Sequence, residues 1–177
     1  MIYRFRILSD ENKEFARELL IHNEQTFLDF HHCLQEDLGF DPKQLASFFL
    51  TNSTWEKQLQ ITLIDMMDDE GGNCITMDQA TIGTYLSTKG QRLIYVFDFF
   101  SERSFFIELT EILEIADKKS LPKIAFSHGD PPIQIDLGLD DTSFLDGDLE
   151  NDLLMDSLDD EFPDDFDYID NDDYPDD

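Results

Sequence analysis

The first residues of the chain alternate between apolar and polar side chains, which is the pattern of a half-buried β-strand. Within residues 2–8, Tyr3, Phe5 and Ile7 fall on one face and two arginines on the other. The turn-forming segment SDENKE follows. Residues 15–21 can then pair back on the first strand, although their composition would also tolerate a helix. We predict a strand there.

An amphipathic helix is predicted immediately afterwards. Thr26 can cap its first turn, with Asp29 three residues later completing a near capping-box pattern. Gly39 follows the last turn and provides a C-terminal stop. The apolar residues between these signals recur at helical spacing, namely Phe27, Phe30, Leu34 and Leu38.

The middle of the chain has weaker patterns. A short, strongly apolar strand is predicted within residues 45–52, and another around residues 59–63. A short helix is predicted between Asp78 as cap and Gly90 as stop. Residues 120–135 contain too many proline and glycine breakers for a regular element, and we expect an irregular cover across the sheet.

Two strongly apolar segments separated by SERS predict a β-hairpin late in the chain. Their alternation should fix the register, because a slip by one residue would turn the core face outward. The alternating residues of the first strand are Leu93, Tyr95 and Phe97 against Ile94, Val96 and Asp98. Six aromatic residues are assigned to the hydrophobic core, namely Phe27, Phe30, Phe48, Phe49, Phe97 and Phe106.

Charge divides the chain into two regions. Residues 136–177 hold 19 Asp and Glu and no Lys or Arg, whereas the remainder has 22 acidic against 12 basic residues. These regions therefore carry −19 and −10 of the total −29. We predict a folded domain at 1–135 and an acidic tail at 136–177. Without basic partners, the tail should be disordered or weakly helical when alone.

The charge and hydropathy also exclude several classes of function. A body at −10 repels phosphate, so direct binding to nucleic acid or to an anionic membrane is not expected. The N-terminus lacks the unbroken apolar stretch of a secretory signal, and no apolar run approaches about 20 residues. A soluble, cytoplasmic protein is the expectation.

Potential metal ligands and nucleophiles are present, but their spacing is unfavourable. His31, His32 and Cys33 are consecutive, so on a helix they point about 100° apart and cannot share one ion. We interpret these histidines as surface or boundary residues, and Cys33 and Cys74 as reduced thiols. His128 lies beside an aspartate in a loop, but no nucleophile motif accompanies it. No metal, no cofactor and no enzymatic activity are predicted.

Two acidic segments invite comparison with calcium loops. The first is DDEGGN, and the second begins at Asp146. In the second, Asn151 stands where an EF-hand loop needs glycine, and Ser157 where it needs a bidentate glutamate. The segment is therefore not an EF-hand.

The order of the motifs resembles a known family. The motifs that carry the resemblance are, in order, YRFRI, a second strand, a helix ending in LGFD, a strand of the ASFFL type, the YVFDFF hairpin and LPKIAFSHGDPP. In this order they resemble the plasmid ORF-three-like family, which is named for an open reading frame on a root-inducing plasmid of the pRiA type. The likeness covers residues 1–135. It implies a compact α+β domain with a curved, mostly antiparallel sheet and helices packed on one face, and it supplies no biochemical activity.

The chain departs from the family at the late hairpin. Members commonly continue this strand as Tyr-x-Tyr-Asp-Phe-Gly-Asp-x-Trp. This chain keeps Tyr95, Phe97, Asp98 and Phe99 of that pattern. Phe100, Ser101 and Arg103 stand where Gly, Asp and Trp would fall. The family's most distinctive turn is therefore lost. A pocket beside Asp98, Arg103 and His128 is the candidate site if the domain binds a small molecule or is an enzyme.

The acidic tail is interrupted by large apolar residues, which a purely solubilising segment would not need. We therefore predict a non-enzymatic interaction protein whose tail binds a basic partner. One such partner would be a nucleic-acid-binding protein, whose basic groove the tail occupies as a phosphate mimic. The alternative is a small-molecule-binding or enzymatic domain with a passive, solubilising tail. The candidate partner-binding residues are Leu153, Leu158, Phe162, Asp164, Asp165, Phe166, Asp167 and Tyr168.

Overall fold

The computed structural model of the chain describes residues 1–65, 75–114 and 120–135. They belong to one compact unit, Met1–Leu139. Its elements in chain order are β1 (Ile2–Ser9), β2 (Ala16–His22), α1 (Phe27–Leu38), β3 (Ser47–Thr51), β4 (Lys57–Thr62), β5 (Ile75–Thr76), α2 (Ile82–Tyr85), β6 (Arg92–Asp98), β7 (Arg103–Leu113) and β8 (Lys123–His128).

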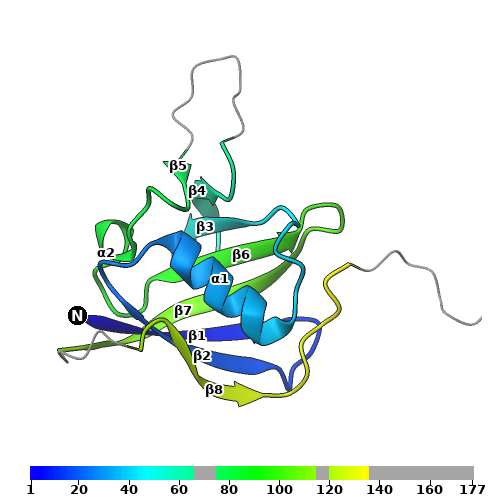
Figure 1. Cartoon of the computed structure of the whole chain (residues 1–177), viewed down its shortest axis with the longest axis horizontal. Coiled ribbons are helices and arrows are strands. Elements are labelled where there is room, and N and C mark those ends of the chain that lie inside the picture. The colour runs from blue at the N-terminus through cyan, green and yellow to red at the C-terminus, as the bar shows by residue number, and fades with distance from the viewer. Residues whose placement is uncertain (66–74, 115–119, 136–177) are drawn as a thin grey trace, which may run out of the picture. The chain divides into compact units, whose positions relative to one another are not determined.

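The strands form one eight-stranded mixed sheet in the order β5-β4-β3-β6-β7-β1-β2-β8 (Figure 1). The β4 and β5 strands are parallel, and the other neighbouring pairs are antiparallel. The described residues contain few helices, since α1 has 12 residues and α2 only four. None of the helices in these ranges is long and apolar enough to cross a membrane.

The N-terminal hairpin is confirmed. β1 pairs with β2 in register from Ile2 opposite His22 to Leu8 opposite Ala16. Its apolar positions, including Phe5, are buried, while its arginines lie on the other face. Residues 16–22 form a strand because pairing with β1 buries Leu19 and Ile21 on the same side.

The helix signals in the sequence are also confirmed. Thr26 accepts a hydrogen bond from the backbone N–H of Asp29 at 3.1 Å, and the Asp29 carboxylate accepts one from the Thr26 N–H at 2.8 Å. This reciprocal pair is the capping box. Gly39 ends the helix with φ of 66°, which is the left-handed conformation that glycine adopts without strain.

An aromatic core lies between α1 and the sheet. The Phe30 ring is 5.0 Å from that of Phe5 on β1 and 5.2 Å from that of Phe48 on β3. Figure 1 shows α1 lying across one face of the central strands. Of the six aromatic residues assigned to the core, Phe49 and Phe106 are only partly buried. They face away from α1, where the register places them on either side of Ile94.

The predicted late hairpin forms, but its turn spans residues 99–102 rather than SERS at 101–104, because β6 ends at Asp98 and β7 begins at Arg103. β6 and β7 pair with Ile94 opposite Phe106 and Tyr95 opposite Phe105. β6 is buried on both faces. Leu93, Tyr95 and Phe97 are buried on one face, and Ile94 and Val96 on the other. Its central place between β3 and β7 explains this burial.

The short helix begins and ends elsewhere than predicted. α2 starts after Thr81, not Asp78, and ends at Tyr85, with Leu86 rather than Gly90 as its C-terminal cap. Asp78 instead lies in a turn in which the Ala80 N–H donates to the Thr76 carbonyl at 3.0 Å. Gly90 adopts φ of 88° before β6, where its N–H donates to the Leu109 carbonyl.

The prediction of an irregular segment at residues 120–135 is wrong for its central part. β8 is a regular strand at the edge of the sheet, antiparallel to β2, with Ala16 opposite His128. The breakers lie outside it, since Pro122 precedes the strand and Gly129 follows it. An edge strand tolerates prolines at its ends. It also tolerates a register shift, such as the one between Glu18 and Leu19 in the β2–β8 pair.

Candidate functional site

The turn between β6 and β7 is built by the carboxylate of Asp98. Its Oδ1 accepts hydrogen bonds from the backbone N–H groups of Phe100 at 2.9 Å and Ser101 at 3.2 Å. This is the Asx-type arrangement that aspartate favours in turns. Glu102 completes the reversal with φ of 54°. The consequence is that Phe99 and Phe100 lie in the turn itself, outside the strand alternation that would bury one of them.

Arg103 fixes this turn to two other segments. Its Nε and Nη2 donate to the Glu11 carboxylate at 2.9 and 2.6 Å, a bidentate pair between β7 and the β1–β2 loop. Nη1 lies 4.0 Å from the Asp98 carboxylate, and the guanidinium lies over the Phe97 ring at 5.3 Å. Nη1 also donates to the Gln134 carbonyl at 3.5 Å. Arg103 therefore has a structural role, in which it holds the β6–β7 turn against the β1–β2 loop and the segment at Gln134.

His128 does not complete the predicted pocket. It is the last residue of β8, and its carbonyl accepts a hydrogen bond from Arg17 Nη1 at 2.7 Å. Its ring stacks on Phe126 with centroids 6.4 Å apart. Asp98 and Arg103 are brought together as neighbours in the β6–β7 register, whereas His128 lines neither of the hollows described below.

A shallow hollow of about 190 Å³ opens beside the turn. Its walls are mostly apolar, and Asp98 contributes the only charged side chain among them. The lining residues are Gln44, Leu45, Phe97, Asp98, Phe99, Phe100 and Ile135. Four of them are large and exposed: Leu45 by 43%, Phe99 by 40%, Phe100 by 97% and Ile135 by 48%. We call Leu45, Phe99, Phe100 and Ile135 the turn-end patch.

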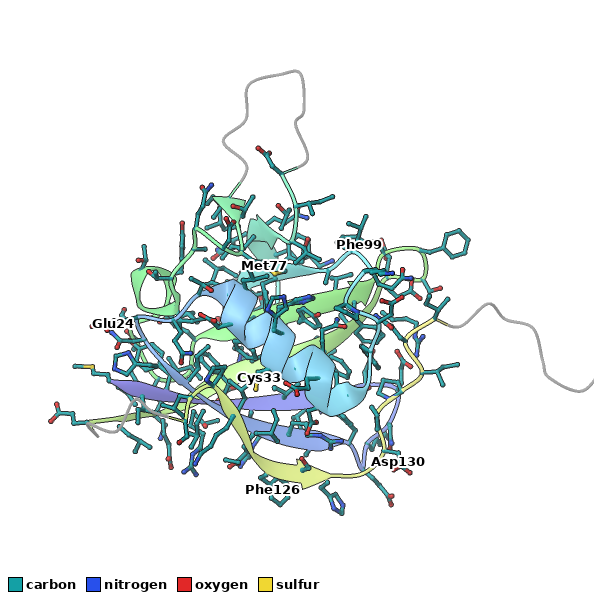
Figure 2. The ribbon with its side chains drawn as sticks, viewed as in Figure 1. Glu24, Cys33, Met77, Phe99, Phe126 and Asp130 are labelled. Carbon is teal, nitrogen blue, oxygen red and sulfur yellow. The ribbon has the colours of Figure 1, made fainter. Side chains whose placement is uncertain are left out.

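A second hollow, of about 310 Å³, lies beside the edge strand β8. Arg6 and Glu18 form an ion pair across it at 3.1 Å, and Phe126 contributes an exposed ring. Figure 2 shows Phe126 on β8 at the bottom of the view and Phe99 at the upper right, and the two hollows share no lining residue. The lining residues of this second hollow are Arg6, Leu8, Ala16, Arg17, Glu18 and Phe126.

The interpretation of His31 as a surface or boundary residue is wrong. Its side chain is fully buried between α1 and β6, where its Nδ1 lies 2.8 Å from the Tyr95 hydroxyl. Gln35 Nε2 donates to the same hydroxyl at 2.7 Å. A neutral imidazole that accepts the hydroxyl proton at Nδ1 satisfies both bonds. Sequence spacing contained a signal for this, since His31 and Gln35 are four residues apart on the buried face. His32, by contrast, is exposed as expected.

Burial controls the ionisation of this cluster. Desolvation, with a smaller contribution from His32, lowers the pKa of His31 from 6.5 to about 4. Desolvation also raises the pKa of Tyr95 well above its usual range, against the opposing hydrogen bond from Gln35. His31 Nε2 and Gln35 Oε1 are buried without a hydrogen-bond partner. The cluster has no exposed side and therefore belongs to the core.

The thiol chemistry of the described residues is limited. Cys33 is a free thiol, half-buried on α1. Burial, and to a lesser degree Asp37 and Glu36, raises its pKa to about 11, so it is protonated at neutral pH. Within 1–65, 75–114 and 120–135, no group of three His, Cys, Asp or Glu side chains could hold a metal ion.

Several predictions fall on residues outside the described ranges. They concern Cys74, the DDEGGN segment, the segment from Asp146 and the whole acidic tail. The partner-binding candidates Leu153, Leu158, Phe162, Asp164, Asp165, Phe166, Asp167 and Tyr168 therefore remain predictions from the sequence.

Comparison with known proteins identifies the class of the sheet domain. The sequence profile described as "Plasmid pRiA4b ORF-3-like protein" matches residues 1–137. The chain belongs to this plasmid pRiA4b ORF-3-like family, as its motif order indicated. A search of characterised proteins found no significant match.

A solved structure has a similar fold. It is the crystal structure of a protein of unknown function, MM3350, from Methanosarcina mazei Go1, with a TM-score of 0.57 and 18% sequence identity. The alignment covers 71% of this chain and 68% of that chain. At this identity the likeness concerns the fold alone.

Proposed function

We propose that the protein is a cytoplasmic, non-enzymatic interaction protein that presents residues 136–177 to a basic protein partner. The observation that carries this proposal is the concentration of −19 in 42 residues that also contain seven Leu, three Phe, two Tyr, one Ile and one Met. A potential of one sign attracts a partner of the opposite sign over a Debye length, about 8 Å at physiological salt. Aromatic and aliphatic groups would then supply the anchoring contacts.

Two features of the described domain support a role in presenting the acidic segment rather than in catalysis. Arg103, a charged residue of the pocket predicted from the sequence, is engaged by the carboxylates of Glu11 and Asp98. The buried polar cluster of His31 and Tyr95 is closed to solvent. A nucleic-acid-binding protein is one fitting partner, because closely spaced carboxylates can occupy a phosphate-binding groove.

Affinity capture from a native lysate tests the proposal. We would compare the full chain, a chain ending at Ile135, and a matched variant in which Phe162, Phe166 and Tyr168 are changed to serine. The variant keeps every charge of the tail. Proteins retained at physiological salt by the full chain and lost from both altered forms would support recognition. An identical set of proteins from all three would reject it.

The second candidate is a small-molecule-binding or enzymatic domain. Its support is the apolar hollow beside Asp98, although 190 Å³ is below the roughly 300–1,000 Å³ of usual ligand pockets. A thermal-shift screen of the full chain against a broad metabolite panel would test it. A stabilising compound whose effect is lost in Asp98→Asn would favour this candidate over the display role.

A further inference from the structure

The turn-end patch includes the residue that immediately precedes the acidic segment, since Ile135 is followed by residue 136. Phe100 is 97% exposed, which is an unusual position for an isolated phenyl ring in water. Phe99, Leu45 and Ile135 lie around the same hollow, so Phe100 belongs to a contiguous group. Exposed aromatic clusters of this kind commonly mark binding sites, because a few buried aromatic anchors supply most of the affinity of an interface.

The geometry of the turn holds these rings outward. The Asp98 carboxylate accepts two turn N–H groups, and Arg103 fixes the base of β7 to Glu11. Gln134, next to Ile135, exchanges two hydrogen bonds with the backbone of Asp41, at 2.6 and 3.1 Å. Both sides of the patch are therefore anchored before any partner binds, which lowers the entropy cost of binding.

The charge around the patch indicates what kind of surface it fits. Asp41 and Glu102 are exposed beside the patch, and the exposed Lys43, whose backbone N–H donates to the Asp41 carboxylate, leaves this border acidic on balance. The segment that carries −19 continues directly from Ile135, a residue of the patch. A partner attracted by that segment is basic, so its apolar groove would be rimmed by lysine or arginine. Such a rim complements the acidic border of the patch.

We infer that the turn-end patch is a docking site for a basic protein segment, with Phe100 as its main anchor. This inference rests on the proposed function, since the acidic segment selects the partner's charge. Attraction by the segment and insertion of Phe100 are two linked contacts, and linking raises the apparent affinity over either one alone. A second copy of this chain is a poor occupant, because each copy carries −29.

The test selects peptides from a phage-displayed library of random 12-residue sequences on the full chain at physiological salt. Synthetic versions of the enriched peptides are then titrated by fluorescence anisotropy. The full chain is compared with Phe100→Ser, with the matched control Phe126→Ser, and with a chain ending at Ile135. Phe126 is 50% exposed and lines the other hollow, so it controls for the loss of any exposed phenyl ring.

The expected peptides combine basic and large apolar residues, and Phe100→Ser weakens their binding about tenfold or more. Phe126→Ser binds as the full chain does. The inference is overturned if Phe100→Ser leaves binding unchanged, if both serine variants weaken it equally, or if no basic and apolar peptides are enriched. It is also overturned if sedimentation shows that Phe100 holds together a dimer of this chain.

The truncated chain separates this inference from the proposed function. Loss of affinity with Phe100→Ser but none on removal of residues 136–177 would support the patch and reject the role of the acidic segment. The reverse result would support the segment and overturn the patch. Because the Phe100 side chain is almost fully exposed, its replacement should leave the melting temperature unchanged, and this is measured first.

Discussion

His31 is a titratable group enclosed by the core, where its neutral form accepts a hydrogen bond from Tyr95. Its pKa falls from 6.5 to about 4 on folding, so the unfolded chain binds a proton at higher pH than the folded chain does. The contribution of His31 to stability is therefore complete above pH 6.5 and is lost as the pH falls through 4. One proton over this interval corresponds to about 3 kcal/mol of unfolding free energy.

Changing His31 to glutamine should remove most of this pH dependence, because an amide can accept the Tyr95 hydroxyl proton but does not titrate. The measurement is urea unfolding of wild type and His31→Gln at pH 7 and pH 4. His128→Gln is the control, since that side chain is exposed on β8 and the carboxylates are common to all three chains. Equal losses of stability in wild type and His31→Gln would contradict the assignment.

For single residues, the sequence predicted the turn-forming and capping roles better than it predicted which distant residues lie close together. Asp98 and Arg103 are brought together because they face each other across a hairpin whose register the alternation determines. His128 is separate because its strand pairs with β2, a contact over more than 100 residues that no local pattern reveals. The exposure of Phe100 depends on where β6 ends, since the turn after Asp98 removes both phenylalanines from the strand alternation.

At the scale of elements, one side chain joins three of them. The buried guanidinium of Arg17 on β2 donates to Asp37 of α1 at 2.6 Å. It also donates to the carbonyls of His128 at 2.7 Å and Gly129 at 3.1 Å, at the end of β8. Arg17 thus ties the edge strand and the end of the helix to the sheet.

Arg17→Met should lower the unfolding free energy by about 3 kcal/mol, because it leaves the Asp37 carboxylate and three carbonyls without their charged donor. Hydrogen exchange should accelerate first in β8. Urea unfolding and exchange mass spectrometry measure both effects. The matched control is Arg6→Met, which removes an exposed ion pair with Glu18 and should cost less than about 1 kcal/mol. If the two variants lose the same stability, the joining role of Arg17 is rejected.

The elements recovered from the sequence are those with local signals. β1 and the β6–β7 hairpin follow from alternation, and α1 follows from Thr26 and Gly39 at its ends. α2 was misplaced because the turn before it uses backbone hydrogen bonds, which leave the cap signal of Asp78 unused. β8 was missed because its flanking prolines and glycine mask a strand that depends on pairing with β2.

For the whole molecule, net charge determines behaviour in acid. The chain carries −29 at neutral pH and has a pI of about 4.1, so its self-repulsion vanishes near that pH. We expect a sharp minimum of solubility close to pH 4. Removal of residues 136–177 should move the minimum to higher pH, because fewer carboxylates remain per basic residue. Turbidity against pH for the two chains measures the shift, and coincident minima would contradict it.

The order of the strands also determines when the domain can form during synthesis. β1 lies between β2 and β7, so the N-terminal hairpin cannot join the rest of the sheet until residue 113 has been made. The sheet is complete only with β8, which ends at His128. Translation of residues 136–177 then takes roughly 2–8 s at about 5–20 residues per second. Every strand of the sheet has thus been synthesised before the acidic segment is added, so folding of the domain does not wait for that segment's sequence.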